Sequence, residues 1–498
     1  MTTVQAHLPI LLILIPLFTG LLTAFLSSGR IAWAVTLVAS WLLPPIAVAL
    51  LYEIDAQGQP VTYELGGWAA PFGIVYYVDH LAVFVVGLVT LIGAVAMPFA
   101  QRSVAKEIDA AAQPRYYTMY LMCLTGLIGI TLTGDAFNAF VFLEISSLAT
   151  YALIAMGRHR RALLAAYQYL ILGTIGATLY VIGVGMLYVL TGTLNFYDMA
   201  ARLQELPAAQ EPSALTAVGF LVVGVSLKLA LFPLHVWLPN AYAYAPSFAT
   251  VFLAGTATKV AIYLLVRLLF SVFGVVVPLD QLPVLEILLG LSVIAMFVAS
   301  ISAVFETNAK RMLAYSSVAQ VGYITLGIAL ANSSGLTGGL VHIFNHGVIK
   351  TCLFLALGAI AYRLTTSRIS DLAGIGRTMP LTMAAFVIAG VSLAGVPGTA
   401  GFVSKWYLAV GALEKDWWFI VLAIVASSLI AVVYLGRFVE IAYFRAPSGP
   451  AAHATDPPLS MLVPLYIFAA ATIYLGLDTR LTAGLAATAS GELLGGLK

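Results

Sequence analysis

The chain has 498 residues, of which 61% are hydrophobic and 9% are charged. Soluble domains carry about 25% charged residues, so this composition excludes a soluble globular protein. The formal net charge of +2 gives no indication of nucleic-acid binding. Its apolar residues form continuous runs, not the alternating pattern of a membrane barrel, and they predict an all-α protein that crosses a membrane many times.

Fourteen apolar stretches are long enough to cross a bilayer, since about 20 helical residues span its hydrocarbon core. The first stretch lacks a basic flank before it and a small-residue cleavage site after it, so we expect a retained helix, not a signal peptide. The predicted spans cover residues 8–27, 31–51, 80–100, 115–133, 136–156, 163–190, 214–238, 247–270, 282–304, 311–331, 335–362, 379–413, 417–440 and 460–477.

Basic residues are distributed unevenly over the loops between these spans. With loops assigned alternately to two sides, fourteen of the 23 Lys and Arg residues lie on one side, four on the other, and five within spans. The positive-inside rule places the basic side in the cytoplasm. We therefore expect a multi-pass protein of a bacterial inner membrane, with both termini on the periplasmic side.

Two of the spans contain helix-breaking residues. The seventh contains Phe232-Pro233, and the twelfth contains GVPGTAG at residues 395–401. Freed backbone groups at membrane depth are tolerated only inside protein or beside a cavity. Because the breaks are five spans apart, we predict two five-helix repeats, spans 4–8 and 9–13, inverted relative to each other. The predicted parts are three N-terminal helices (1–105), the first repeat (115–270), the inverted repeat (282–440), and a C-terminal helix and tail (441–498).

Ionisable side chains lie inside these otherwise apolar spans. A charged group at the bilayer centre costs about 2.5–3.5 kcal/mol on insertion scales. Snorkelling or interhelical pairing explains one such residue easily but seven poorly, so we interpret the set as an ion or proton pathway. The set comprises Glu144, Lys228, Lys259, His342, His346, Lys350 and Lys405.

The positions of these residues suit reversible protonation. At about 1.5 Å per helical residue, Lys259 and Lys350 fall near the middle of the bilayer. His342, His346 and Lys350 follow one helical face at four-residue intervals, and histidine titrates near neutral pH, so the three predict a proton relay. Glu144 and Lys228 are the obvious pair of opposite charge.

Other polar residues give weaker indications. His235 lies beside the first break. It is either an accessory residue of the predicted proton pathway or a cap for backbone groups that the break leaves without a partner. Arg267 lies near the outer end of its span, where we expect it to snorkel.

The chain has no phosphate loop, dinucleotide fingerprint, cysteine cluster or haem motif, so we predict no cofactor and no metal. These features favour a secondary transporter subunit over an enzyme.

The chain contains three long motifs, namely Ser226–Pro246 (SLKLALFPLHVWLPNAYAYAP), Lys310–Tyr323 (KRMLAYSSVAQVGY) and Val341–Phe354 (VHIFNHGVIKTCLF). These motifs resemble the antiporter-like subunits shared by respiratory complex I and Mrp-type multisubunit cation/proton antiporters. The resemblance covers nearly the whole chain. In that family, a glutamate of the fifth helix and charged residues of the seventh, eighth and twelfth helices form a proton path along the membrane plane. By resemblance these are Glu144, Lys228, Lys259 and Lys405, with His342, His346 and Lys350 as the central relay.

Two further stretches, Glu144–Arg161 and Tyr169–Gly192, resemble the D subunit of the Mrp antiporter in particular. This resemblance implies a proton-translocating subunit of a Na+/H+ antiporter, with other membrane subunits, protons and Na+ or another monovalent cation as partners. Two alternatives remain, a proton-pumping subunit of a redox-driven complex I-like or hydrogenase complex, and a scaffold with vestigial charges. Lys405 replaces the glutamate of one complex I subunit. Tyr242 replaces a histidine of many relatives and is therefore only an accessory candidate.

Overall fold

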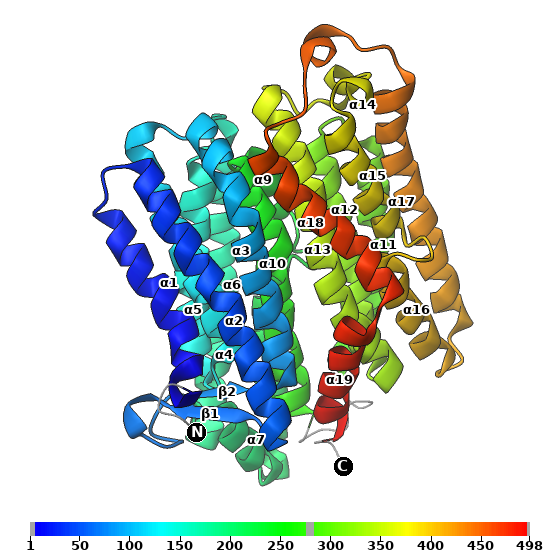
Figure 1. The fold of residues 1–498 in the computed structure, drawn as a ribbon. Helices are drawn as coiled ribbons and strands as arrows, with labels where there is room; N and C mark the ends of the chain where they lie inside the picture. Colours follow the sequence, from blue (N-terminus) through cyan, green and yellow to red (C-terminus); the bar gives the residue numbers. More distant parts are fainter. Residues whose placement is uncertain (1–4, 275–282, 496–498) are drawn as a thin grey trace.

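Long helices that run in alternate directions form the protein (Figure 1). The structure is a computed structural model, and it describes residues 5–274 and 283–495. Eleven helices in this part of the chain are long and apolar enough to cross a membrane, and two shorter ones are also apolar. This architecture confirms the predicted all-α class.

The described residues form nineteen α-helices, numbered in chain order. The first ten are α1 (Leu8–Ala24), α2 (Gly29–Gln57), α3 (His80–Glu107), α4 (Gln113–Leu132), α5 (Ala136–Ala155), α6 (Arg161–Thr191), α7 (Phe196–Gln204), α8 (Glu211–Leu229), α9 (Leu238–Tyr244) and α10 (Ser247–Val266), the last continued by a π-helix over Arg267–Phe273. The remaining nine are α11 (Pro283–Phe305), α12 (Ala309–Leu330), α13 (Ser333–Arg363), α14 (Ile375–Thr378), α15 (Pro380–Ala394), α16 (Ala400–Leu413), α17 (Trp418–Phe444), α18 (Leu459–Leu477) and α19 (Leu485–Gly495).

Each predicted span coincides with one helix or with two consecutive helices. The number of membrane crossings, the inverted repeats and the boundaries of the four parts stay predictions. Two residues used in the predictions lie outside the described residues. These are residue 282, the expected start of the ninth span, and Lys498, one of the basic residues assigned to the outer side. Helix α19 and the start of α1 lie at the same end of the bundle (Figure 1). We call the opposite end, formed by residues 108–112, 156–160, 306–308 and 364–379, the basic end.

A short hairpin between α2 and α3 was not expected from the sequence. Its strands β1 (Val61–Glu64) and β2 (Val75–Val78) are antiparallel, with Val61 opposite Val78. Their β-branched and aromatic residues favour a strand, but the runs are too short to stand out beside the apolar spans. The ring of Tyr77 lies 4.0 Å from that of Tyr197 on α7, so the hairpin and α7 cover the same end of the bundle.

Both helix breaks lie where proline and glycine predict them. Helix α8 ends at Leu229, after which Ala230 adopts a left-handed conformation with φ of 60°. Helix α15 ends at Ala394, after which Gly395 has φ of 89°. Residues 396–399 are not α-helical, so the twelfth predicted span is divided into α15 and α16. In the seventh predicted span only α8 is helical, because residues 231–237 are not α-helical and α9 begins at Leu238, the last residue of that span.

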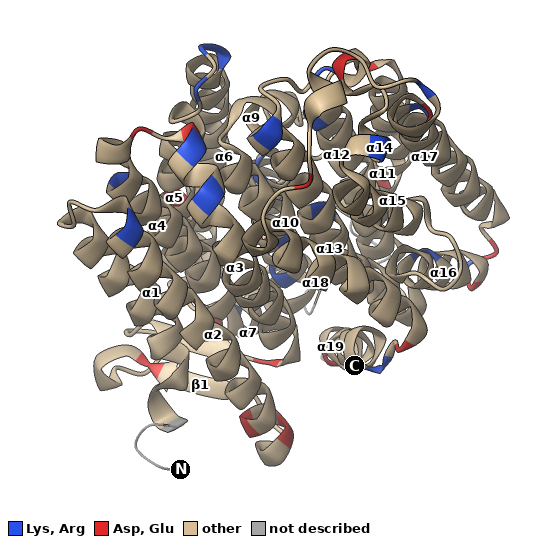
Figure 2. Ribbon diagram, turned by 45° about the horizontal axis from the view of Figure 1, so that its top comes forward, with Lys and Arg blue, Asp and Glu red and all other residues tan. Residues whose placement is uncertain are grey.

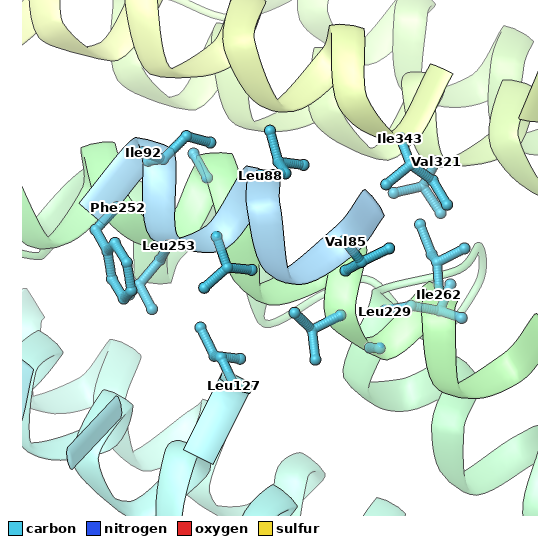
Figure 3. Packing of buried hydrophobic residues seen from close by; sticks show 14 of the residues in the cluster. Val85, Leu88, Ile92, Leu127, Leu229, Phe252, Leu253, Ile262, Val321 and Ile343 are labelled. Atoms are coloured by element: carbon cyan, nitrogen blue, oxygen red, sulfur yellow. The ribbon is translucent and has the colours of Figure 1, made fainter. Parts of the chain in front are cut away.

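Helix α13 forms the centre of the bundle. All of its most apolar 18-residue stretch is buried, compared with 33% of the equivalent stretch of α2 or α17. Side chains of α3 pack between α10 and α13 (Figure 3). Glycines let α10 and α13 approach closely, since a Cβ at Gly347 would lie 2.9 Å from the carbonyl oxygen of Gly255. The helix that carries both histidines and Lys350 is therefore held in the protein interior.

Candidate proton pathway

The helices that carry the predicted charges lie side by side. Helix α8 packs against α10, α10 against α13, and α13 against α16. Each contributes one buried lysine, so Lys228, Lys259, Lys350 and Lys405 follow one another across the bundle. Figure 2 shows Lys and Arg both at the basic end and in the interior of the bundle. We call these four lysines, with Glu144, His342 and His346, the charged row.

Glu144 and Lys228 meet at one end of the charged row. The Nζ of Lys228 lies 3.5 Å from Oε1 of Glu144 and donates a hydrogen bond of 2.7 Å to Oγ of Ser147. The hydroxyl of Tyr151 is 3.4 Å from the same nitrogen. The side chain of Glu144 is 24% exposed, whereas that of Lys228 is 4% exposed. The predicted pair therefore exists as a contact, with its acid at the flank of the bundle and its base inside.

A small cavity joins Lys228 to helix α10. Its volume is about 30 Å³, and it is lined by Ser147, Thr150, Lys228 and apolar residues of α10. A cavity of about 10–15 Å³ is already large enough to hold one water molecule. The cavity therefore has room for a water between Lys228 and the apolar residues of α10.

The two central lysines have no carboxylate partner among the described residues. The Nζ of Lys259 donates to the carbonyl oxygen of Ala254 and lies 3.4 Å from Oγ1 of Thr258. The Nζ of Lys350 donates to the carbonyl oxygen of Leu313 at 2.8 Å and to Oγ of Ser316. Burying a charge with only neutral partners is unfavourable, so stability alone gives no reason for these lysines.

His346 lies between the central lysines and His342. Both of its ring nitrogens are buried and have no hydrogen-bond partner in the described part of the chain. The rings of His346 and His342 are nearly parallel, with centroids 5.9 Å apart. Buried polar atoms without partners are rare in folded proteins and call for an explanation such as a functional role.

His342 links α13 to α16. Its Nδ1 lies 2.7 Å from Oγ of Ser404, and its Nε2 lies 2.9 Å from Oε1 of Gln320. The ring of Tyr323 lies 5.6 Å from that of His342, and the Nζ of Lys405 is 4.8 Å from the centre of the tyrosine ring. A continuous set of polar and aromatic groups thus leads from His342 to Lys405.

Lys405 also satisfies the second helix break. Its Nζ donates hydrogen bonds of 3.1 and 3.0 Å to the carbonyl oxygens of Leu393 and Ala394, and one of 2.9 Å to Oγ of Ser428. The two carbonyl groups end α15, where they have no partner within the helix and where the helix dipole favours a cation. The last lysine of the row is therefore held by the break itself.

Comparison with known proteins identifies the family. The family described as "NADH:quinone oxidoreductase/Mrp antiporter, TM" matches residues 133–431, which include all seven residues of the charged row. The chain belongs to this family. It is 41% identical to "NADH-quinone oxidoreductase subunit N" of Desulforudis audaxviator, over 95% of this chain and 96% of that protein. It is 31% identical to the D subunit of the Na(+)/H(+) antiporter of Alkalihalophilus pseudofirmus, over 86% of both proteins.

A solved structure in this NADH:quinone oxidoreductase/Mrp antiporter family has the same fold. A chain of the Mrp complex from Dietzia sp. DQ12-45-1b matches with a TM-score of 0.89 at 26% identity, over 100% of both chains. The expected resemblance to antiporter-like membrane subunits is therefore confirmed. The chain is a membrane subunit of the antiporter-like kind found in Mrp complexes and complex I.

The two accessory candidates lie outside the charged row of this family member. The buried ring of His235 packs against Phe232 and Tyr315, and its Nδ1 has no hydrogen-bond partner among the described residues. The hydroxyl of Tyr242 donates to the carbonyl oxygen of Leu253 at 3.1 Å, which ties α9 to α10. Tyr242 also forms a hydrogen bond with Thr258, whose hydroxyl lies 3.4 Å from Nζ of Lys259. The accessory roles of Tyr242 and His235 stay predictions.

The expectation that Arg267 snorkels is wrong. Its side chain is 5% exposed, its guanidinium forms an ion pair with the carboxylate of Asp79, and its Nε donates to the hydroxyl of Tyr263 at 2.9 Å. Helices α7 and α19 pack against this end of the span. Protein, not lipid, therefore surrounds Arg267, and the sequence of its own span could not reveal those neighbours.

Sequence reasoning also missed the uncharged residues that contact the charged row. Gln320 and Ser404 pair with the ring nitrogens of His342, and Tyr323 lies between His342 and Lys405. Ser147 and Tyr151 surround the Nζ of Lys228. Only ionisable residues in apolar spans were selected, because their insertion cost makes them conspicuous. Gln320 and Tyr323 lie within the 310–323 motif, so its polar positions were the available signal.

Proposed function

We propose that this subunit moves protons along the charged row, within a multisubunit membrane complex. One observation carries the proposal: of the four lysines of the charged row, Lys259, Lys350 and Lys405 are held by neutral groups alone among the described residues. Each buried charge of this kind costs about 2.5–3.5 kcal/mol at the bilayer centre. A group that carries protons must gain and lose them in turn, so proton transfer requires ionisable side chains such as these lysines in the interior.

The geometry suggests how a proton would pass between helices. The cavity beside Lys228 gives water a place in the step from α8 to α10. In the next step, the imidazole of His346 takes a proton on one nitrogen and releases it from the other, since neither is engaged by a described protein group. His342 then passes it toward Lys405 through the groups around Ser404 and Tyr323.

Glu144 is the member of the row best placed to respond to a neighbouring subunit. Its carboxylate is partly exposed at the flank of α5, and it lies 3.5 Å from the ammonium group of Lys228. A change in this separation alters the electric field along the row, because charges interact more strongly inside protein than in water. We therefore assign coupling to the pair of Glu144 and Lys228.

Two kinds of complex fit a proton-translocating subunit. The likeness to the D subunit of the Na(+)/H(+) antiporter and to the Mrp complex supports an antiporter that exchanges protons for Na+ or another monovalent cation. The 41% identity to NADH-quinone oxidoreductase subunit N supports the second candidate, a pumping subunit of a redox-driven complex. Purification of the intact complex distinguishes them, since Fe–S or flavin subunits occur only in the second.

Neutralising either member of the coupling pair tests the proposal. In membrane vesicles, Glu144→Gln or Lys228→Ala should abolish proton transport, measured with a pH-sensitive dye. Removing one member of a buried pair is typically destabilising by about 3–5 kcal/mol, so assembly must be measured on the same membranes. Lys415→Ala, which changes a loop lysine over Trp417, is the matched control and should transport normally. Normal transport by both row variants, with normal assembly, would refute the proposal.

A further inference from the structure

A large polar cavity lies at the basic end of the bundle, apart from the charged row. Its volume is about 630 Å³, and its walls come from the ends of α3, α9, α10, α12 and α13 and from the loops at residues 158–161 and 364–368. Glu107 is the one acidic residue among those that line it. The basic residues that line it are Lys106, Arg158, His159, Arg161, Lys310 and Arg368.

Glu107 offsets only part of the positive charge of this cavity, since it is one carboxylate among five Lys and Arg side chains. The two oxygens of Glu107 already accept hydrogen bonds from Oγ of Ser103 at 2.8 Å and from the backbone N–H of Ser247 at 2.9 Å. Nζ of Lys310 donates to Oγ of Ser247 at 3.1 Å. The cavity is therefore rich in donors and positive charge.

The exposed cations of the cavity are not paired with acids. Nη1 of Arg161 donates to the hydroxyl of Tyr244 at 3.0 Å, and Nζ of Lys106 donates to the carbonyl oxygen of Tyr362. Among the described residues, neither side chain forms an ion pair with a carboxylate, and the same holds for Arg158 and Arg368. Such a cluster is complementary to a group with several anionic oxygens, such as a phosphate.

An adjoining groove indicates that this phosphate belongs to a lipid. The groove has a volume of about 210 Å³, shares Arg161 and Tyr244 with the cavity, and continues past Leu164 and Ala165 on α6. Its other cation, Arg311, is already paired with Glu306 at 3.0 Å. Beyond the groove, α6 exposes large apolar side chains, namely Leu163, Leu164, Tyr167 and Ile171. A phosphate site that opens onto an apolar surface fits a headgroup with its acyl chains, whereas a soluble phosphate compound leaves that surface unused.

We propose that this cavity binds the phosphate of an anionic phospholipid, whose acyl chains lie along α6. Basic pockets between membrane helices on the cytoplasmic side bind anionic headgroups by this combination of charge and apolar contact. The site does not depend on proton transfer, because none of its basic residues belongs to the charged row.

Lipid binding to the purified complex tests this site. The complex is stripped of lipid, then titrated with phosphatidylglycerol or with phosphatidylethanolamine of the same chains, and bound lipid is counted by native mass spectrometry. We expect a clear preference for phosphatidylglycerol. Replacing both Arg158 and Arg161 with Gln should weaken its binding about thirtyfold. Arg115→Gln, an exposed change at the same end but outside the cavity, should leave it unchanged.

Two further arms complete the test. Arg158→Lys with Arg161→Lys keeps both charges and should retain most of the binding, which separates loss of charge from loss of folding. Inorganic phosphate at millimolar concentration should not displace the lipid. Equal binding of the two lipids, full affinity in the double Gln variant, or complete displacement by inorganic phosphate would each overturn the proposal.

Discussion

Among single residues, Lys405 combines a structural contact with a place in the charged row. Its Nζ donates to the last carbonyl oxygens of α15 and lies over the ring of Tyr323, which in turn faces His342. A fixed cation at this position is enough to cap α15, whereas proton transfer requires one that titrates. Substitution can separate the two roles.

Replacing Lys405 with Ala or with Arg distinguishes a relay from a cap. Lys405→Ala removes both roles and should abolish proton transport in vesicles. Lys405→Arg retains a cation for the carbonyl groups of α15 but stays protonated, so it should keep the thermal stability of the complex and still block transport. Full transport by the Arg variant would instead show that a fixed positive charge suffices.

Among the elements, the helices and their breaks were predictable from the sequence, whereas their contacts were not. Apolar runs set the spans, and Pro233 and the glycines at 395–401 set the breaks, because these effects are local. The pairing of Glu144 with Lys228 was predictable from charge. The hydrogen bonds of Lys405 to carbonyl oxygens were not, since backbone acceptors have no sequence signal. The ion pair of Arg267 with Asp79 depends on neighbouring helices and was missed for that reason.

The second break supplies a prediction about Gly395. A Cβ at this position would lie 2.9 Å from Cδ of Lys405, and its φ of 89° is unfavourable for other residues. Gly395→Ala should therefore destabilise the protein by about 1–2 kcal/mol and also impair transport by displacing the lysine. Gly398→Ala is the matched control, since Gly398 has φ of 82° but open space where a Cβ would lie.

Thermal unfolding and vesicle transport measure the two effects of these glycine variants. Both variants should lose stability because both positions have left-handed backbone, and only Gly395→Ala should lose transport. If Gly395→Ala transports protons as well as Gly398→Ala does, the position of Lys405 beside the break has no functional importance.

For the whole molecule, the positive-inside rule predicts that the basic end faces the cytoplasm. The predicted cytoplasmic loops with most of the Lys and Arg residues lie at that end, opposite α19 and the start of α1 (Figures 1 and 2). The bundle has the fold of a chain in the Mrp complex, and its central helix α13 carries three residues of the row.

Cysteine labelling checks this orientation. Cys123 and Cys352 are both buried, so an introduced exposed cysteine should dominate the reaction with a membrane-impermeant maleimide. Gln59→Cys, near the hairpin, should react in intact spheroplasts, and Ser448→Cys, at the basic end, should react only after the membrane is opened. The reverse pattern would place the termini in the cytoplasm.

Replacing Lys259 with Met tests the central claim, proton movement through the charged row, most directly. Lys259 has only a carbonyl oxygen and a threonine hydroxyl as described partners, and its charge costs about 2.5–3.5 kcal/mol at the bilayer centre. Proton uptake by liposomes containing the purified complex should be lost in Lys259→Met, with thermal stability unchanged or raised, while Lys415→Met behaves as wild type. Wild-type proton uptake in Lys259→Met would contradict the account and favour a scaffold whose buried charges have no role in transport.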